Sequence, residues 1–254
     1  MHKAGEKEAG SKEDKICIRR WRKIGEYSVG SQINLSNDQV KLILSNLTRI
    51  STKSKNSLEG RAQTIELIVP QLGELVIKKY SRGGFLKNFI SHHYLRFFTL
   101  RPFLEFQMLT RVKELGVNAP TPVAVISKGS FIYLAWLVLY RIHNKGTLVT
   151  ISKNSILDAR RYTEQLVHQL MNLIENKIYH IDLHPGNVIV CSKTDEPFIL
   201  DFDKAKIYRG SKEKLKELYL RRWRRAVIKH NLPEILAEIM CLGLRSVSDQ
   251  GKII

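Results

Sequence analysis

Cysteine is scarce in this sequence, which has only Cys17, Cys191 and Cys241 and no pair with C-x-x-C spacing. An odd count without paired spacing argues against a disulfide framework and a structural zinc site. Long apolar runs are also missing, since the longest, Phe131 to Tyr140, is too short to span a bilayer. The N-terminus carries no apolar stretch of the signal-peptide kind. We therefore expect a protein of a reducing, cytoplasmic compartment.

Acidic residues are few as well. The chain of 254 residues has 24 Asp and Glu against 42 Lys and Arg, a formal net charge of +18. Its hydrophobic content of 43% is typical of a globular protein, and its length allows one large domain or two small lobes around a buried core. An excess of positive charge of this size indicates an anionic partner. The candidates are nucleic acid, an acidic membrane surface and a phosphorylated substrate.

The positive charge is concentrated in two segments. Lys78 to Arg101 has six basic residues and no acidic one, and Lys204 to His230 has eleven basic residues and two Glu. Within the second segment, apolar residues recur at helical spacing between the basic ones: Leu215, Leu218, Tyr219, Trp223, Ala226 and Val227. This pattern predicts an amphipathic helix whose basic face meets anionic headgroups or a phosphate backbone, and the sequence leaves both open.

Periodicity predicts strands first and helices later. We expect strands at 65–69, 75–79, 122–126 and 131–140, a strand pair at 187–191 and 198–202, and helices at 101–115, 155–175 and from 211 onward. Residues 36–50 carry both signals and stay open. The fold class is therefore α+β, with a small β-rich lobe at 21–143, a larger helical lobe at 144–254 and a cleft between them. Residues 1–20 are expected to be a disordered basic tail.

One motif carries chemistry. His180, Asp182 and Asn187 follow the spacing H-x-D-x4-N, and an apolar segment then ends in Asp201-Phe202. This combination is typical of the catalytic and metal-binding loops of the protein-kinase-like fold. Phosphoryl transfer needs a group that orients and deprotonates an attacking hydroxyl, a role that Asp182 fits, and oxygen ligands for Mg²⁺, which Asn187 and Asp201 supply. The alternative is that these residues only form turns and caps.

His180 and His184 could instead be metal ligands. They lie in a Pro-Gly loop rather than on a helix, however, and His180 matches the structural histidine of the motif.

A kinase site also needs a lysine and a glutamate from the first half of the chain. The strand that ends in Lys78 resembles the V-A-I-K strand, and alternation places Val76 and Lys78 on one face. We expect Val76 to cover the adenine of ATP, Lys78 to bind the phosphates and Glu105 to pair with Lys78. Lys79 is the alternative lysine, and Glu105 could instead complement the helix dipole. A glycine-rich phosphate loop is missing, since only Gly60 stands between the candidate strands.

Five segments, taken in order, resemble the 3-deoxy-D-manno-octulosonic acid (Kdo) kinases of the lipopolysaccharide core kinase family. The first is Lys78 to Leu86, which is similar to an R-x-Y-x-R-G-G signature although Lys78 stands where Arg is common. The others are residues 103–106, 115–124, the pair 180–187 with 201–203, and 219–225. The residues His184-Pro185-Gly186, between Asp182 and Asn187, also differ from those usual in the catalytic loop of this family.

The resemblance implies ATP-dependent, Mg²⁺-assisted phosphorylation of a Kdo hydroxyl, the 4-position, on Kdo–lipid A. It also implies a peripheral enzyme at the cytoplasmic face of the inner membrane, whose anionic surface suits the basic charge. Nucleic acid is then not an expected partner. Arg82, Gly83 and Gly84 form either an acceptor-binding loop or a tight turn. In the first case, Arg82 acts with His92, His93 and Arg96 on the Kdo carboxylate or the lipid A phosphates.

Alternatives remain. A heptose kinase of the same family shares most of these motifs. A choline or aminoglycoside kinase has the same fold, but its cationic acceptors call for acidic residues that are scarce here. A protein kinase is disfavoured by the missing A-P-E segment. A nucleic-acid-binding module with a degenerate kinase site is permitted by the basic helix, and a steep salt dependence of binding without ATP turnover would indicate it.

Overall fold

The computed structural model describes residues 18, 20–48, 64–80, 101–129 and 134–250. Its first part is built on a six-stranded antiparallel sheet in the order β1-β2-β5-β6-β4-β3. The strands are β1 (Arg20–Ile24), β2 (Tyr27–Ser31), β3 (Thr64–Val69), β4 (Gly73–Tyr80), β5 (Pro122–Lys128) and β6 (Leu134–Tyr140). Two helices pack on this sheet, α1 (Asn37–Asn46) and α3 (Arg101–Glu114).

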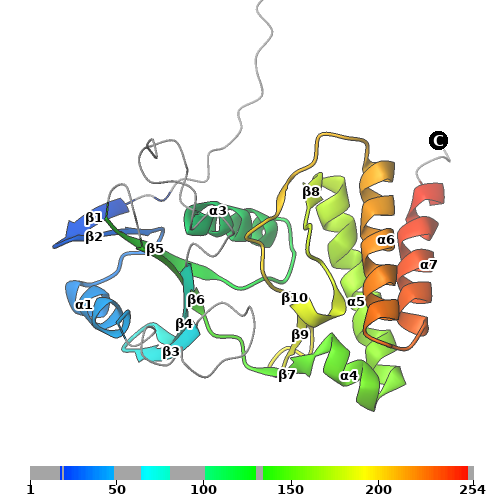
Figure 1. Cartoon of the computed structure of the whole chain (residues 1–254), viewed down its shortest axis with the longest axis horizontal. Helices are drawn as coiled ribbons and strands as arrows, with labels where there is room; N and C mark the ends of the chain where they lie inside the picture. Colours follow the sequence, from blue (N-terminus) through cyan, green and yellow to red (C-terminus); the bar gives the residue numbers. More distant parts are fainter. Residues whose placement is uncertain (1–17, 19, 49–63, 81–100, 130–133, 251–254) are drawn as a thin grey trace, which may run out of the picture.

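The second part is mainly helical. Its helices are α4 (Leu148–Asn154), α5 (Ile156–Glu175), α6 (Lys212–Lys229) and α7 (Ile235–Gln250). Short strands and a 3₁₀ turn lie between them: β7 (Asn144–Thr147), β8 (Ile178–Tyr179), η3 (Pro185–Asn187), β9 (Val188–Cys191), β10 (Pro197–Ile199) and β11 (Lys206–Ile207). Figure 1 shows the large sheet at one end of the molecule and α5, α6 and α7 side by side at the other. Of the helices within the described ranges, none has both the length and the hydropathy that crossing a membrane requires.

The two faces of the large sheet belong to different hydrophobic clusters. Ala124 and Ile126 of β5 pack in a cluster with α1, whereas Val125, between them, packs in the cluster that contains Phe106 of α3. Since successive strand residues point to opposite faces, α1 and α3 cover opposite sides of the sheet.

The same alternation sets the direction of Lys78. In β4, Leu75 and Ile77 are buried in the α1 cluster, so Val76 and Lys78 face the other side, toward α3.

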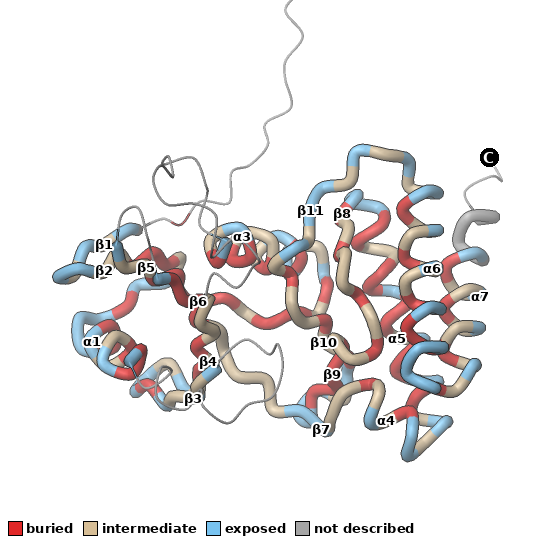
Figure 2. The backbone as a smooth tube through the Cα atoms, viewed as in Figure 1, coloured by how far each residue is buried: buried red, intermediate tan, exposed pale blue. Residues whose placement is uncertain are grey.

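The cluster on the α3 side continues into the helical part. It joins Phe106 and Leu137 to Leu166 and Leu170 of α5 and to Trp223 of α6. In Figure 2 the tube is coloured as buried along much of β5, β6 and α5, while the outer faces of α6 and α7 are exposed. A shared core of this kind holds the sheet and the helices in a defined relation, so residues from both parts can build one site.

The structure confirms the α+β class, the strands β3 and β4, which pair antiparallel, and helices α3 and α5. Ser155 is the N-cap of α5 rather than its first residue, since its side chain accepts a hydrogen bond from the Asp158 N–H. The amphipathic helix from 211 is α6, which buries Leu215, Tyr219 and Trp223. The domain limits of 21–143 and 144–254 stay a prediction, although Ile18 is buried and Arg20 begins β1.

One expected strand is corrected, one open segment is resolved and one hairpin is new. Residues 36–50, left open above, contain α1, which begins with a capping box between Ser36 and Gln39. The strand expected at 198–202 ends at Ile199 because Asp201 has a positive φ of 63° and cannot continue an extended strand. The hairpin of β1 and β2 was not predicted. The N-terminal segment 1–17, Gly60 and residues 131–133 lie outside the described residues.

Candidate active site

The loop between β8 and β9 is fixed by a buried histidine. His180 donates from Nε2 to the Leu200 carbonyl oxygen at 2.9 Å, and its ring meets the Phe202 ring edge-on with centroids 4.7 Å apart. Burial lowers the pKa of His180, so the ring is neutral and keeps this tautomer. His180 therefore joins the loop to the Asp201 segment and acts as a structural residue rather than a metal ligand.

Helix α6 holds the same loop from the other side. The His180 backbone N–H donates to Tyr219 Oη at 2.8 Å, and the Tyr219 hydroxyl donates to the Ile178 carbonyl oxygen at 2.8 Å. Tyr219 is only 1% exposed, and burial raises the pKa of its phenol well above the usual value, so it remains a donor. One hydroxyl thus satisfies two buried backbone groups just before Asp182.

The Asp182 carboxylate is bracketed by two cations. Lys204 Nζ donates to Oδ2 at 2.7 Å and Arg222 Nη2 donates to Oδ1 at 2.8 Å. The hydrogen bond from Lys204 lowers the pKa of Asp182, and the charge of Arg222 adds to this effect. The carboxylate is therefore ionised over the whole neutral range and can accept a hydrogen bond from a hydroxyl group.

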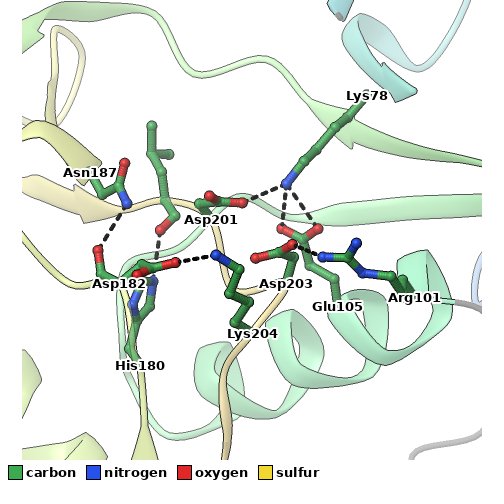
Figure 3. A network of polar contacts seen from close by, with 10 residues as sticks. Lys78, Arg101, Glu105, His180, Asp182, Asn187, Asp201, Asp203 and Lys204 are labelled. Carbon is green, nitrogen blue, oxygen red and sulfur yellow. Dashed lines mark hydrogen bonds and ion pairs between the residues drawn. The ribbon is translucent and has the colours of Figure 1, made fainter. Parts of the chain in front are cut away.

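A second cluster joins the sheet to the Asp201 segment (Figure 3). Lys78 Nζ lies 3.0 Å and 3.2 Å from the two Glu105 carboxylate oxygens and 2.7 Å from Asp201 Oδ1. The Glu105 side chain is 2% exposed, whereas that of Asp201 is 43% exposed. Glu105 therefore anchors the ammonium group from the protein side, and Asp201 faces solvent beside it.

Burial and charge act in opposite directions within this cluster. Burial lowers the pKa of Lys78, but Glu105 and Asp201 outweigh burial and the net shift is upward. Burial raises the pKa of Glu105 to about 7, against the opposing effect of Lys78. The lysine is thus charged at neutral pH, as a phosphate-binding group must be.

The backbone around Asp201 is unusual. Its φ of 63° lies in the left-handed region, which non-glycine residues seldom adopt and which is concentrated at functional sites. Two residues on, Asp203 Oδ2 accepts a hydrogen bond from Arg101 Nη2 at 2.7 Å. Arg101 begins α3, so this ion pair ties the Asp201 segment to the helix that carries Glu105.

Asn187 and Asp201, on two segments joined by a hydrogen bond, carry side-chain oxygens that could ligate a metal cation. Asn187 donates from Nδ2 to the Asp182 carbonyl oxygen at 3.0 Å, which leaves its Oδ1 available, and its own carbonyl oxygen accepts from the Leu200 N–H at 2.8 Å. Asp201 follows Leu200 directly. Mg²⁺ takes one or two protein oxygens together with phosphate oxygens and waters, so Asn187 and Asp201 fit it. Within the described ranges there is no group of three or more His, Cys, Asp or Glu that could hold a metal ion.

The structure brings together the residues that the motifs singled out. Lys78, Glu105, Asp182, Asn187 and Asp201 lie in two linked clusters, although the chain separates Lys78 from Asp201 by 123 positions. Their roles with ATP remain predictions.

The other predicted residues are placed as follows. Val76 is half-buried on the face of β4 that carries Lys78, and alternation puts Lys79 on the opposite face. Arg82, Gly83 and Gly84, with His92, His93 and Arg96, lie outside the described residues.

Sequence reasoning missed the partners of Asp182. Lys204 stands one residue after Asp203 and could have been noticed from that position. Arg222 entered only as one residue of the basic segment 204–230 and of the segment 219–225, because nothing in its spacing tells which arginine of α6 turns inward. Arg101 was likewise treated as part of a basic segment.

Comparisons of this sequence with known proteins identify kinases as its relatives. The model of the lipopolysaccharide kinase (Kdo/WaaP) family matches residues 47–237. A 3-deoxy-D-manno-octulosonic acid kinase of Vibrio vulnificus is 31% identical over 156 residues, which are 60% of this chain and 64% of the relative. The kinase of the same name from Vibrio cholerae is 27% identical over 163 residues, or 62% and 67% of the two chains.

A third relative of the same name, from Mannheimia succiniciproducens, is 30% identical over 135 residues, which are 50% of this chain and 55% of the relative. The chain thus matches less than two thirds of the Vibrio vulnificus relative's length. The family match nevertheless covers well over half of this chain and includes both clusters described above. The chain belongs to the lipopolysaccharide kinase (Kdo/WaaP) family.

Proposed function

We propose that this protein transfers the γ-phosphoryl group of ATP to a hydroxyl of 3-deoxy-D-manno-octulosonic acid, the 4-hydroxyl, on Kdo–lipid A. One observation carries the proposal: the ionised Asp182 and the Lys78–Glu105–Asp201 cluster are linked through Asn187 and Leu200. Phosphoryl transfer needs a hydroxyl-orienting group and a charge-neutralising cluster in one site. The names of the relatives support the choice of acceptor.

The nucleotide half of the site would work through Lys78. Its ammonium group binds the phosphates, and the buried Glu105 carboxylate holds the lysine chain in one direction. Val76, on the same face of β4, covers the adenine. Because the lysine is already held in place, it loses less side-chain entropy on binding a phosphate than a flexible side chain would.

Asn187 and Asp201 would hold Mg²⁺, which neutralises charge on the phosphates when it is bound. Asp201 contacts Lys78 through Oδ1, and its exposed side chain would offer Oδ2 to the metal.

Asp182 would orient the attacking hydroxyl and accept its proton. Lys204 and Arg222 lower the pKa of Asp182, so it is a weak base in the ground state. That suits a loose transition state, in which the hydroxyl loses its proton late and needs orientation more than early deprotonation.

The exposed outer face of α6 suits an anionic membrane surface. Arg221, Arg224 and Arg225 are exposed there, next to the exposed apolar side chains of Ile228 and Leu242. We infer a peripheral enzyme at the cytoplasmic face of the inner membrane, because basic and apolar groups together bind an anionic leaflet. Nucleic acid is not the expected partner.

The test is transfer of label from ATP, with Mg²⁺, to Kdo–lipid A and in parallel to a heptosylated acceptor whose Kdo is blocked. We expect label on Kdo, located at O4 by phosphorus–proton correlation, and none with the Asp182→Asn variant. Label on heptose alone would replace the proposal with a heptose kinase. Label on neither acceptor, with ATP bound, would contradict the proposed acceptor.

A further inference from the structure

The two cations on Asp182 are more than one carboxylate needs. Arg222 and Lys204 each occupy one oxygen of Asp182, so the three groups together carry a net charge of +1. Each of these oxygens has a second lone-pair site, so an acceptor hydroxyl can approach Asp182 while both cations stay in place. The site therefore carries one positive charge more than Asp182 neutralises.

The two cations face different neighbours. The hydrogen bond with Asp182 raises the pKa of Lys204, and Asp203 and Asp201 add to the effect, so Lys204 lies on the side of the nucleotide and metal groups. Arg222 comes from α6 and lies near His184: burial lowers the pKa of His184, and the charge of Arg222 lowers it further. Arg222 thus reaches Asp182 from α6, whereas Lys204 reaches it from the segment that follows Asp203.

Arg222 also has unused hydrogen-bonding capacity. Its side chain is 35% exposed, and in the part of the chain that the structure describes only Nη2 makes a hydrogen bond, the one to Asp182. A guanidinium group has five N–H donors in a planar fork that matches a carboxylate. Arg222 can therefore bind a second carboxylate beside Asp182 without leaving the site.

We propose that Arg222 binds the carboxylate of the acidic acceptor sugar and thereby selects it over neutral sugars. This inference rests on the proposed function. In a 3-deoxy-2-ulosonic acid the carboxylate and the 4-hydroxyl stand on ring carbons separated by a single carbon. One sugar can thus place its hydroxyl on Asp182 and its carboxylate on the adjacent guanidinium.

The experiment measures acceptor saturation with a water-soluble Kdo glycoside and with the methyl ester of the same glycoside. For wild type, the ester should have a KM about 10–100-fold higher than the acid, the range for losing a charged hydrogen-bonding pair. Arg222→Gln should raise the KM for the acid by a similar factor and change the KM for the ester by less than about 3-fold. Arg222→Lys keeps the charge but loses the planar fork of donors, so its KM for the acid should lie between those of wild type and Arg222→Gln.

Lys229 is an exposed cation in the last turn of α6, so Lys229→Gln is the matched control. It should change neither the KM for the acid nor the KM for the ester. The unfolding midpoint of each variant checks that the fold is kept. Equal losses on the acid and the ester would overturn the inference, because Arg222 would then only position Asp182.

A binding measurement separates this inference from the proposed function. If wild type phosphorylates neither glycoside, the proposed function fails, and calorimetric titration of the acid glycoside into the protein decides on Arg222. Binding of the acid that is lost in Arg222→Gln supports the inference on its own. Equal binding of acid and ester by wild type overturns it.

Discussion

Glu105 gives the protein a pH dependence that one substitution should remove. The side chain is 2% exposed, and burial raises the pKa of Glu105 from 4.5 to about 7 despite the neighbouring Lys78. A folded state with a raised carboxyl pKa binds its proton more tightly than the unfolded chain. The resulting stabilisation is complete below pH 4.5 and is lost as the pH rises through 7.

The magnitude follows from the two pKa values. A shift from 4.5 to about 7 corresponds to about 3 kcal/mol in the free energy of unfolding, at about 1.4 kcal/mol per pH unit. Glu105→Gln fills the same volume and cannot ionise. We therefore expect the stability of this variant, relative to wild type, to rise by about 3 kcal/mol between pH 4.5 and pH 8. In a chain of this size, that is a relative shift of about 6–12 °C in Tm.

The assay is urea unfolding of wild type and Glu105→Gln at several pH values, with Glu114→Gln as the control. Glu114 ends the same helix and is exposed, so its variant should show a constant difference from wild type. The ion pair with Lys78 is already contained in the pKa of Glu105, so its loss is part of the same pH-dependent difference. A constant difference between wild type and Glu105→Gln would refute the reasoning, because Glu105 would then be ionised throughout.

Three further predictions concern α6 and the loop that it supports. Tyr219→Phe leaves two buried backbone groups without a partner, so urea unfolding should show a loss of about 1–3 kcal/mol, and an unchanged midpoint would contradict the bridging role. Burial lowers the pKa of His180, so wild-type stability should fall below about pH 6.5 by up to about 1.4 kcal/mol per pH unit, and His180→Gln should remove that slope. The affinity for anionic vesicles, measured by sedimentation, should fall roughly 100-fold when Arg221, Arg224 and Arg225 are all changed to Gln, at about 1 kcal/mol for each arginine. Binding that is insensitive to this change and to salt would instead indicate an apolar anchor.

Much of the site could be predicted because its signals are local. Asp182 and Asn187 stand at a fixed spacing in one loop, and strand alternation alone puts Val76 and Lys78 on one face. Glu105 required one assumption, that the helix after the strand packs over Lys78, and the structure has that contact.

Arg222 could not be found in the same way. It is one of several arginines on α6, and which of them turns toward Asp182 depends on how the helix packs through Tyr219 and Trp223. That packing is a tertiary property with no signature in the local spacing.

The missed elements have similar causes. The β1–β2 hairpin escaped notice because Lys23 breaks the short alternation around Trp21 and only Trp21 and Ile24 are apolar in β1. The helix α1 had a readable start in Ser36 and Gln39, but its apolar residues fit a strand pattern as well. The bend at Asp201 is set by a backbone conformation that composition does not reveal.

The most direct test of the account is the rate of a single turnover with saturating ATP, Mg²⁺ and Kdo–lipid A, for wild type and Asp182→Asn. The rate should be about 10²–10⁴-fold lower in the variant, because orientation and proton acceptance are lost, while the affinity for a fluorescent ATP analogue changes by less than about 3-fold. A variant that keeps more than about a tenth of the wild-type rate would contradict the assignment of Asp182 and the mechanism built on it.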